Sequence, residues 1–368
     1  MKTSKQFNLF SFENGFIPAA ACVVLFITAA AIGCQKETDE LLPGNQTPGA
    51  TNGRMADAHF VQVNLVSNHD GEGAAQTNAD LAHAWGLYMG AGSRGTWVTS
   101  VDKGLALQFD ELGNSLQIPL IVGDAEQPTA VVASGGNFSG PDMTRAADLL
   151  FADLSGRIMA STPGGTTVQP MVDRSAKGAK YTGLAIVTLG ARHFLYAADF
   201  ANGRIDVFDE RFGFVPHRAL ADPNLPEGYA PYNLKFVDGE LYVVYAIPAR
   251  NGEAMTGSSR GWVSVFRADG SFVRSLDASV ALNAPWGIEV AGQHVLVANH
   301  GDGTINIYDR ASGRYEGKMM TGENVPLTIE GLRGISFNSS REMRMLYFTA
   351  SPYDHDGLFG YLKRSDDF

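Results

Sequence analysis

The side chains in this chain that are best suited to binding chemistry are aromatic and basic. Trp85, Tyr229, Tyr232 and Trp286 have flat, amphipathic faces that could stack on sugar rings, and Arg333 could fix an acidic group through its planar guanidinium. Tryptophan beside an inner strand is also a common core residue. The sequence therefore leaves both roles open for these residues.

A second set of polar residues ends two strand-like runs. Asn299, His300 and Asp302 follow one run, and His355 follows another. Binding residues often occupy such loop positions because the rigid elements behind them fix their place. Asp and Asn next to Gly are equally the usual residues of hairpin turns, so a turn role competes with a ligand role here.

The elements that must position these residues form a repeat. A short signature, which ends in Gly or a small polar residue before Leu, Ile or Ala, recurs about every 50 residues. Its copies are Trp85-Gly86-Leu87, Pro128-Thr129-Ala130, Thr182-Gly183-Leu184, Tyr232-Asn233-Leu234, Trp286-Gly287-Ile288 and Arg333-Gly334-Ile335. Each copy precedes strand–turn–strand runs rich in β-branched and aromatic residues.

Six such units predict an all-β fold, a six-bladed β-propeller of four-stranded blades. A small residue in each innermost strand lets neighbouring sheets approach at the channel. The last unit ends one strand short, whereas residues 59–66 form a strand without a blade. We therefore expect this N-terminal strand to join the last blade and close the ring, which removes two exposed edges.

Several stretches match the residue order of familiar functional motifs but not the structural context that these motifs require. Residues 90–95 fit a dinucleotide fingerprint, but a strand follows where a helix is required. Residues 257–261 fit a nucleophile elbow, but they lie in a polar hairpin insertion. Residues 68–73 begin like a calcium loop, but Ala79 stands where the bidentate acid belongs. All three are interpreted as turns.

These repeats resemble those of two known families. Residues 194–210 are similar to the repeat of NHL-type propellers. Over about three hundred residues the chain also resembles an uncharacterised bacterial β-propeller family, known as conserved hypothetical proteins without a functional name. The stretches that carry this second resemblance are residues 65–68, 70–71, 78–87, 196–198, 203–208, 222–226, 228–231, 285–287, 301–306, 346–350 and 357–360. It implies a propeller fold and no established activity or site residues.

The N-terminus is typical of a secreted lipoprotein. An apolar run over residues 16–33 precedes Cys34, and Ala31-Ile32-Gly33-Cys34 resembles a bacterial lipobox with Cys34 as the lipid attachment residue. An ordinary transmembrane anchor is the alternative. Residues 35–40 resemble the signal that exports Bacteroidetes lipoproteins to the cell surface, although any tether can contain such charges. We expect a lipid-anchored protein of the bacterial outer membrane that faces outward. The alternative is that it lies on the periplasmic face.

The predicted domains are a signal peptide over residues 1–33, a lipidated flexible tether over 34–57 and the propeller over 58–368. The net charge of −11 disfavours nucleic acid as a partner. Both cysteines, Cys22 and Cys34, precede the propeller, which leaves no thiol for a disulfide or zinc cluster within it. We expect a monomer that contacts the membrane through its lipid only.

Two functions fit these observations. One is a binding module for a glycan, a peptide or an envelope protein, with no cofactor expected. The other is a hydrolase similar to the six-bladed lactonases and gluconolactonases, in which Ca²⁺ or another divalent cation in the channel polarises a carbonyl. The residue types that this chemistry needs are found at Asp199, Asn233, Asn283 and Glu330. His300 or Asp302 would then act as general base.

Overall fold

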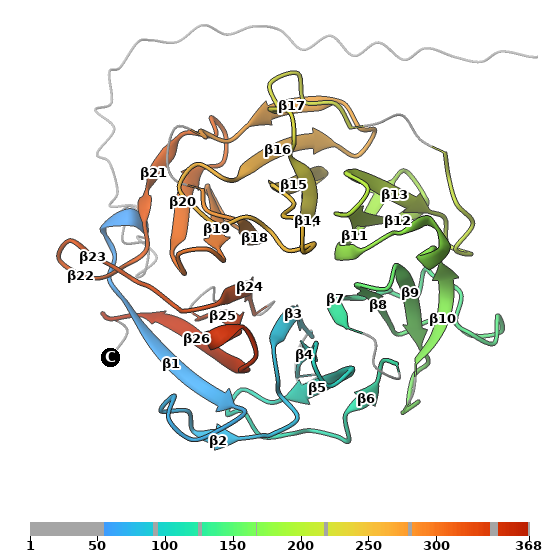
Figure 1. Ribbon diagram of the computed structural model, residues 1–368, viewed down its shortest axis with the longest axis horizontal. Helices are drawn as coiled ribbons and strands as arrows, with labels where there is room; N and C mark the ends of the chain where they lie inside the picture. Colours follow the sequence, from blue (N-terminus) through green and yellow to red (C-terminus); the bar gives the residue numbers. More distant parts are fainter. Residues whose placement is uncertain are drawn as a thin grey trace, which may run out of the picture. The chain divides into compact units, whose positions relative to one another are not determined.

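Six antiparallel sheets follow one another along the chain and surround a common axis (Figure 1). The computed structural model describes residues 55–90, 95–123, 127–166, 168–216, 220–278, 282–338 and 345–366. Cys34 and the predicted signal and tether up to residue 54 lie outside the described residues. In the described part of the chain, no helix is long and apolar enough to cross a membrane.

Each blade begins at the axis and proceeds outward. The innermost strands are β3 (Ala84–Met89), β7 (Pro128–Ala133), β11 (Tyr181–Leu189), β14 (Ala230–Val237), β18 (Pro285–Ala291) and β24 (Leu332–Phe337). The second strands are β4 (Thr96–Ser100), β8 (Leu149–Asp153), β12 (Arg192–Asp199), β15 (Glu240–Ala246), β19 (His294–Asn299) and β25 (Met345–Ala350). The third strands are β5 (Leu105–Phe109), β9 (Arg157–Ser161), β13 (Arg204–Phe208), β16 (Trp262–Arg267), β20 (Ile305–Asp309) and β26 (Leu358–Arg364).

The outer strands vary more than the inner ones. They are β6 (Leu120–Ile121), β10 (Val168–Asp173), β17 (Phe272–Ser275) and β21 (Tyr315–Lys318). Among the described residues, the third blade has three paired strands, with an isolated bridge between Phe208 and Phe214 beyond them. A ribbon of β22 (Met320–Gly322) and β23 (Val325–Pro326) connects the fifth and sixth blades, and the described helices are the short 3₁₀ turns η1 (Met55–Asp57), η3 (Ser175–Lys177) and η4 (Pro352–Asp354).

The ring closes as the sequence predicts. Strand β1 (Phe60–Ser67) pairs antiparallel with β26, from Phe60 opposite Arg364 to Ser67 opposite Leu358, and β2 (Gln76–Thr77) adds outside it. The six-bladed propeller and its N-terminal closure are therefore confirmed. Residues 55–57, expected in the tether, instead form η1, whose Met55 and Ala56 pack against the core between the fifth and sixth blades.

Burial explains why the blades hold together. An apolar cluster lies between each neighbouring pair of blades. Between the fifth and sixth blades, for example, Leu296 and Ile307 pack with Leu346 and Phe348. The signature glycines permit the close approach that this needs, because a Cβ on Gly287 would lie 2.3 Å from the carbonyl oxygen of Arg333.

Candidate functional site

All six inner strands share one irregularity near the start of the strand. Each has a β-bulge in its pairing with the second strand, at the signature itself. Bulges re-aim side chains and increase local twist. The leading residues of the bulged segments are Trp85, Thr129, Thr182, Tyr232, Trp286 and Arg333, which we call the axial layer.

The large members of the axial layer meet across the axis. The ring of Trp85 lies 6.1 Å from that of Trp286 and 6.3 Å from that of Tyr232, centroid to centroid. Arg333 places its Cζ 4.0 Å from the Trp85 centroid, and its Nη1 donates a 3.0 Å hydrogen bond to the Tyr232 hydroxyl. Trp286 Nε1 donates to the carbonyl of Thr182 at 2.9 Å. These contacts join five of the six blades through side chains.

The charge of Arg333 is buried in this layer. Only 6% of the residue is exposed, and among the described residues no carboxylate lies within ion-pair distance of its guanidinium. Burial raises the pKa of Tyr232, so its hydroxyl stays neutral and accepts from Arg333. Arg333 is therefore held by an aromatic face and a phenol rather than by an acid.

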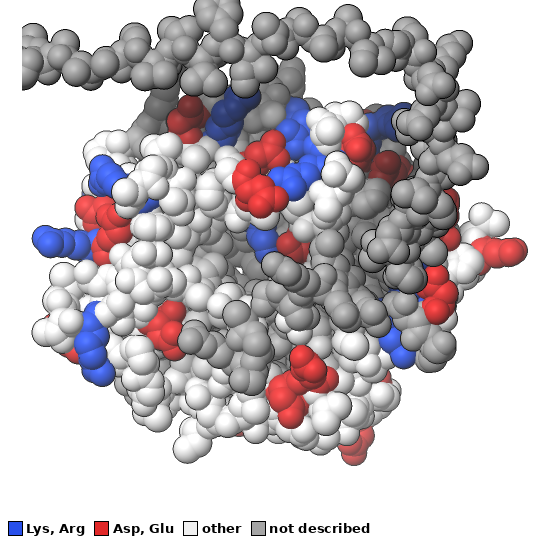
Figure 2. All heavy atoms as spheres, turned by 180° about the vertical axis from the view of Figure 1, so that it is seen from behind, with Lys and Arg blue, Asp and Glu red and all other residues white. Residues whose placement is uncertain are grey.

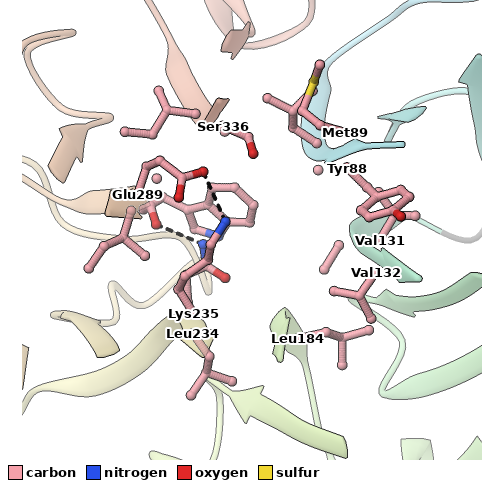
Figure 3. A pocket seen from close by; sticks show the side chains of 18 of the residues that line it. Tyr88, Met89, Val131, Val132, Leu184, Leu234, Lys235, Glu289 and Ser336 are labelled. Carbon is pink, nitrogen blue, oxygen red and sulfur yellow. Dashed lines mark hydrogen bonds and ion pairs between the residues drawn. The ribbon is translucent and has the colours of Figure 1, made fainter. Parts of the chain in front are cut away.

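On one side of the axial layer the channel widens into a pocket of about 590 Å³ (Figure 3). Its wall is mostly apolar and comes from all six blades, with side chains that include Met89, Val131, Val132, Leu184, Leu234 and Ile335. The face seen in Figure 2 is hollowed near its centre, where basic and acidic groups lie side by side. Such a cavity has the size and lining of a site for a small organic ligand.

An ion pair is the charged part of this pocket, and the polar side chains of Tyr88, Asn233, Ser336 and Asn338 also line it. Lys235 Nζ of β14 lies 3.0 Å from Glu289 Oε2 of β18, in the neighbouring blade (Figure 3). Glu289 also accepts from the backbone N–H groups of Phe337 and Val290, at 3.2 and 3.0 Å. The carboxylate is thus fixed at three points, while Ser336 brings its hydroxyl to the same wall.

Histidines lie near the other side of the axial layer. His83, two residues before Trp85, stacks on its indole at 5.5 Å. Its Nδ1 lies 3.2 Å from Asp102 Oδ1, and His355 Nδ1 lies 3.0 Å from Asp102 Oδ2. Burial, with a contribution from Arg333, lowers the pKa of His83, whereas the hydrogen bond to Asp102 raises the pKa of His355. Burial also lowers the pKa of His300 well below its ordinary value, so this imidazole is neutral at neutral pH.

The structure brings together part of the binding set expected from the sequence. Trp85, Tyr232, Trp286 and Arg333 meet in the axial layer, but their exposed fractions are 6% or less. They pack on one another and leave little face for a sugar ring. Tyr229 lies apart, in a groove between the third and fourth blades, and its hydroxyl donates to the carbonyl of Ser259.

The turn residues of the fifth blade have the structural role that competed with ligand binding. Asn299 Oδ1 accepts from the backbone N–H of Asn283 at 3.0 Å. Asp302 Oδ1 accepts from the backbone and hydroxyl of Thr304, at 3.1 and 2.7 Å. Asn299 Nδ2 also donates to the Thr304 hydroxyl at 3.3 Å, so both side chains stabilise the hairpin between β19 and β20.

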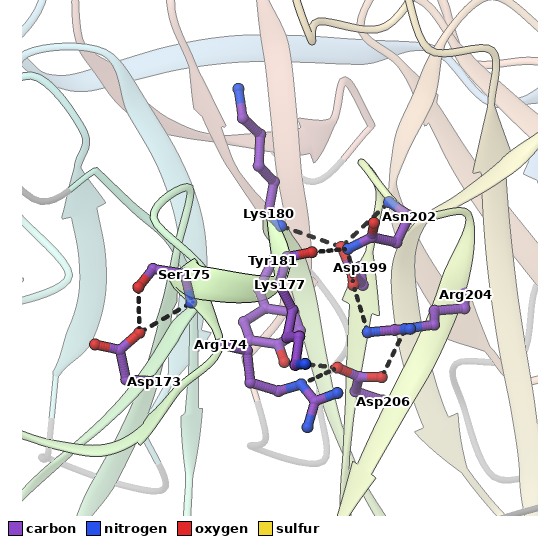
Figure 4. Close-up of polar contacts among 10 residues, drawn as sticks. All are labelled: Asp173, Arg174, Ser175, Lys177, Lys180, Tyr181, Asp199, Asn202, Arg204 and Asp206. Carbon is purple, nitrogen blue, oxygen red and sulfur yellow. Dashed lines mark hydrogen bonds and ion pairs between the residues drawn. The ribbon is translucent and has the colours of Figure 1, made fainter.

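The four residues predicted to hold a channel metal have separate partners or are exposed. Asp199 closes its own hairpin by accepting from Asn202 and from the backbone of Lys180, with Arg204 3.5 Å away (Figure 4). Asn233 donates to the carbonyl of Trp286, Asn283 accepts from Gly257, and Glu330 is exposed. No hydrogen bond joins any two of these side chains, all of which the structure describes. Arg204 beside Asp199 would also repel a cation.

Sequence reasoning missed four residues that the structure places at the axis or its rim. These are His83, Asp102, Lys235 and Glu289. A signal was available for two of them, because Lys235 and Glu289 each stand two positions after the signature centre, on strands that should be apolar. Charges at matching places on neighbouring inner strands indicate a pair across the blades. His83 and Asp102 offered no comparable pattern.

Fold and axial site together define a six-bladed β-propeller with a ligand-sized channel pocket. No protein-family model matches the chain. It is 33% identical over 320 residues to protein R648 of Acanthamoeba polyphaga mimivirus, covering 80% of this chain and 78% of that protein. It is 31% identical over 327 residues to mimivirus protein L690, covering 82% and 85%. The chain belongs to the family of these two proteins.

These relatives correct the resemblance proposed from the sequence. The propeller fold that it implied is confirmed, but the curated relatives are viral proteins, so the assignment to a bacterial family was wrong. Residue patterns of blades and turns recur wherever the fold does. They therefore identified the fold without identifying its source.

Solved structures support the fold alone. A structural genomics protein of unknown function from Bacteroides thetaiotaomicron aligns with a TM-score of 0.55 at 14% identity, covering 83% of this chain and 77% of that chain. A structure titled streptogramin B lyase aligns with a TM-score of 0.51 at 13% identity, covering 85% and 100%. Such identities carry no activity over to this chain.

Proposed function

We propose that this protein is a binding module that holds a small organic ligand in the axial pocket. The observation that supports this most is the pocket of about 590 Å³ at the point where all six blades converge. Its apolar wall would bury the body of the ligand, since burial of apolar area supplies most of the binding free energy. Lys235, Glu289 and Ser336 would orient the polar part.

The pocket's chemistry narrows the ligand class. Lys235 and Glu289 neutralise each other at 3.0 Å, so this pair adds no net charge to the site. An uncharged or zwitterionic molecule with an apolar body fits this arrangement better than an anion. A glycan fits less well, because the large aromatic residues of the axial layer are buried against one another.

The metal-dependent hydrolase alternative has less support. It needs a cation on the axis held by Asp199, Asn233, Asn283 and Glu330, and these side chains are engaged separately or exposed. Binding of a ligand needs only the cavity and its polar groups. We therefore place the binding function first.

The test is thermal melting of the purified propeller against a library of small apolar, neutral and zwitterionic compounds. A Ser336→Trp variant puts an indole into the pocket, and Ile121→Trp puts the same group on the exposed outer strand β6. We expect some compounds to raise the Tm of wild type and Ile121→Trp but not of Ser336→Trp. Compounds that raise the Tm of all three proteins equally would place binding elsewhere and refute the proposal.

We also propose that the propeller is anchored through a lipid on Cys34 and faces outward from a bacterial outer membrane. The support is the lipobox-like run before Cys34 and the charged residues after it. Expression in a bacterial host with labelled palmitate should label wild type but not Cys34→Ser. Protease added to intact cells should then remove the domain, and full protection would contradict the outward orientation.

A further inference from the structure

Two imidazoles and a carboxylate converge where the first and last blades meet. His83 precedes β3, Asp102 lies in the turn between β4 and β5, and His355 lies in the loop between β25 and β26. The nearest ligand-type atoms of the three side chains all lie within 4.8 Å of one another. Both imidazoles direct Nδ1 at the same carboxylate, one at each oxygen.

Backbone contacts hold the three residues in place independently of their side chains. The N–H of His83 donates to the carbonyl of His355 at 2.9 Å, which joins the two blades directly. The N–H of Val101 donates to the carbonyl of His83 at 3.2 Å and so fixes the turn that bears Asp102. The φ angle of His83 is +52°, a strained value for a residue with a Cβ. The three side chains are therefore preorganised by the fold.

Local charge also suits a cation at this place. Asp102 has no Lys or Arg within ion-pair distance among the described residues, and Asp354 and Asp356 add negative charge beside His355. The buried Arg333 lies over the face of Trp85 and donates to the Tyr232 hydroxyl, and although its charge lowers the pKa of His83, the three carboxylates Asp102, Asp354 and Asp356 outnumber it. Two neutral imidazole nitrogens and one carboxylate oxygen are a preferred ligand set for divalent transition metals.

We propose that His83, Asp102 and His355 form a divalent-metal site of the zinc type at the seam between the first and sixth blades. The nitrogen ligands select Zn²⁺ over Ca²⁺ or Mg²⁺, which prefer oxygen. Three protein ligands leave one tetrahedral position for water or for a donor atom of a ligand. The metal links the first and sixth blades, between which the β1–β26 pairing also closes the ring, so it stabilises the ring.

The site is separate from the axial pocket. Its three residues are absent from the pocket lining. The buried axial layer lies between these residues and that cavity. Metal binding and pocket binding can therefore fail independently. Ser336→Trp should abolish the pocket ligand and leave metal binding unchanged.

The experiment measures Zn²⁺, Mn²⁺ and Ca²⁺ binding to the tag-free propeller by calorimetry and elemental analysis after chelation. We expect one Zn²⁺ per chain, with a higher Tm that the chelator reverses. His355→Ala suits this test because the side chain is 81% exposed and its loss should not unfold the protein. Its Zn²⁺ affinity should fall about 100-fold or more, since even second-shell losses cost 10–100-fold.

Two further variants make the result specific. Asp102→Ala should weaken Zn²⁺ binding as His355→Ala does. His69→Ala is the matched control, because His69 is another partly exposed imidazole that lies 3.0 Å from an acid, Asp356. It should bind Zn²⁺ like wild type. A wild-type protein that binds no Zn²⁺, or a His355→Ala protein that binds it equally, would overturn the proposal.

Discussion

The guanidinium of Arg333 lies over the indole of Trp85, with Cζ 4.0 Å from the ring centroid, although the two residues belong to the last and first blades of the ring. The same guanidinium donates to Tyr232 of the fourth blade. This single cation therefore connects three blades at the axis.

Replacing Arg333 with Lys tests this connection. Lysine keeps the charge but loses the planar stack on Trp85 and the hydrogen bond to Tyr232, so we expect a loss of about 1–3 kcal/mol in the free energy of unfolding. Urea denaturation measures it. Arg145→Lys, at an arginine whose side chain is 62% exposed, is the control and should change little. Equal midpoints for Arg333→Lys and wild type would contradict the role of the stack.

Deleting Phe60 to Val66 tests ring closure. The deletion removes the paired neighbour of β26 over almost its whole length and exposes the edge of the last blade. Exposed edges pair with other chains, so we expect loss of cooperative melting and aggregation during size-exclusion chromatography. A deletion protein that remains monomeric with the wild-type Tm would show that closure contributes nothing to stability.

Asp153 should make the free energy of unfolding depend on pH. This carboxyl is fully buried, and burial raises its pKa from 3.8 to about 6 although Oδ1 accepts from Ser155 and Arg157. Its folded form holds a proton more tightly than its unfolded form. The stability it contributes is complete below pH 4 and lost as pH rises through 6, by about 3 kcal/mol.

Asp153→Asn should remove this loss, because an amide does not titrate. Asparagine also suits the position, since Asn299 occupies the corresponding strand end in the fifth blade. Between pH 4 and 7, the difference in unfolding free energy between variant and wild type should move by about 3 kcal/mol in favour of the variant. Urea denaturation across this range measures it. Asp142→Asn is the control, because that acid is exposed and backbone hydrogen bonds lower its pKa to about 2. A difference that does not vary with pH would refute the assignment.

Lys235 and Glu289 should be coupled. Lys235→Met leaves the buried carboxylate of Glu289 without its cation and should destabilise the fold by about 2 kcal/mol. The double variant Lys235→Met/Glu289→Gln removes the orphaned charge and should recover part of that loss. Strict additivity of the two single changes in denaturant unfolding would mean that the pair contributes no interaction energy.

The sequence determined the number of blades and the closure of the ring. Both depend on features that are periodic or local along the chain, namely the repeated signature, the strand-length apolar runs and an unpaired strand at each end of the domain. It also determined where small residues must stand, because Gly183, Gly287 and Gly334 mark the close approach of inner strands. These predictions needed no knowledge of which distant residues meet.

Only the tertiary structure decided the site. A bulge re-aims Trp85 and Arg333 into mutual contact, and their burial makes a floor for the pocket rather than a surface for sugars. Asp199 and Asn299 have the residue types of ligands but stabilise hairpins, because turns and metal sites use the same polar side chains. His83, Asp102 and His355 meet only because closure brings the first blade against the last, and no spacing in the sequence encodes that contact.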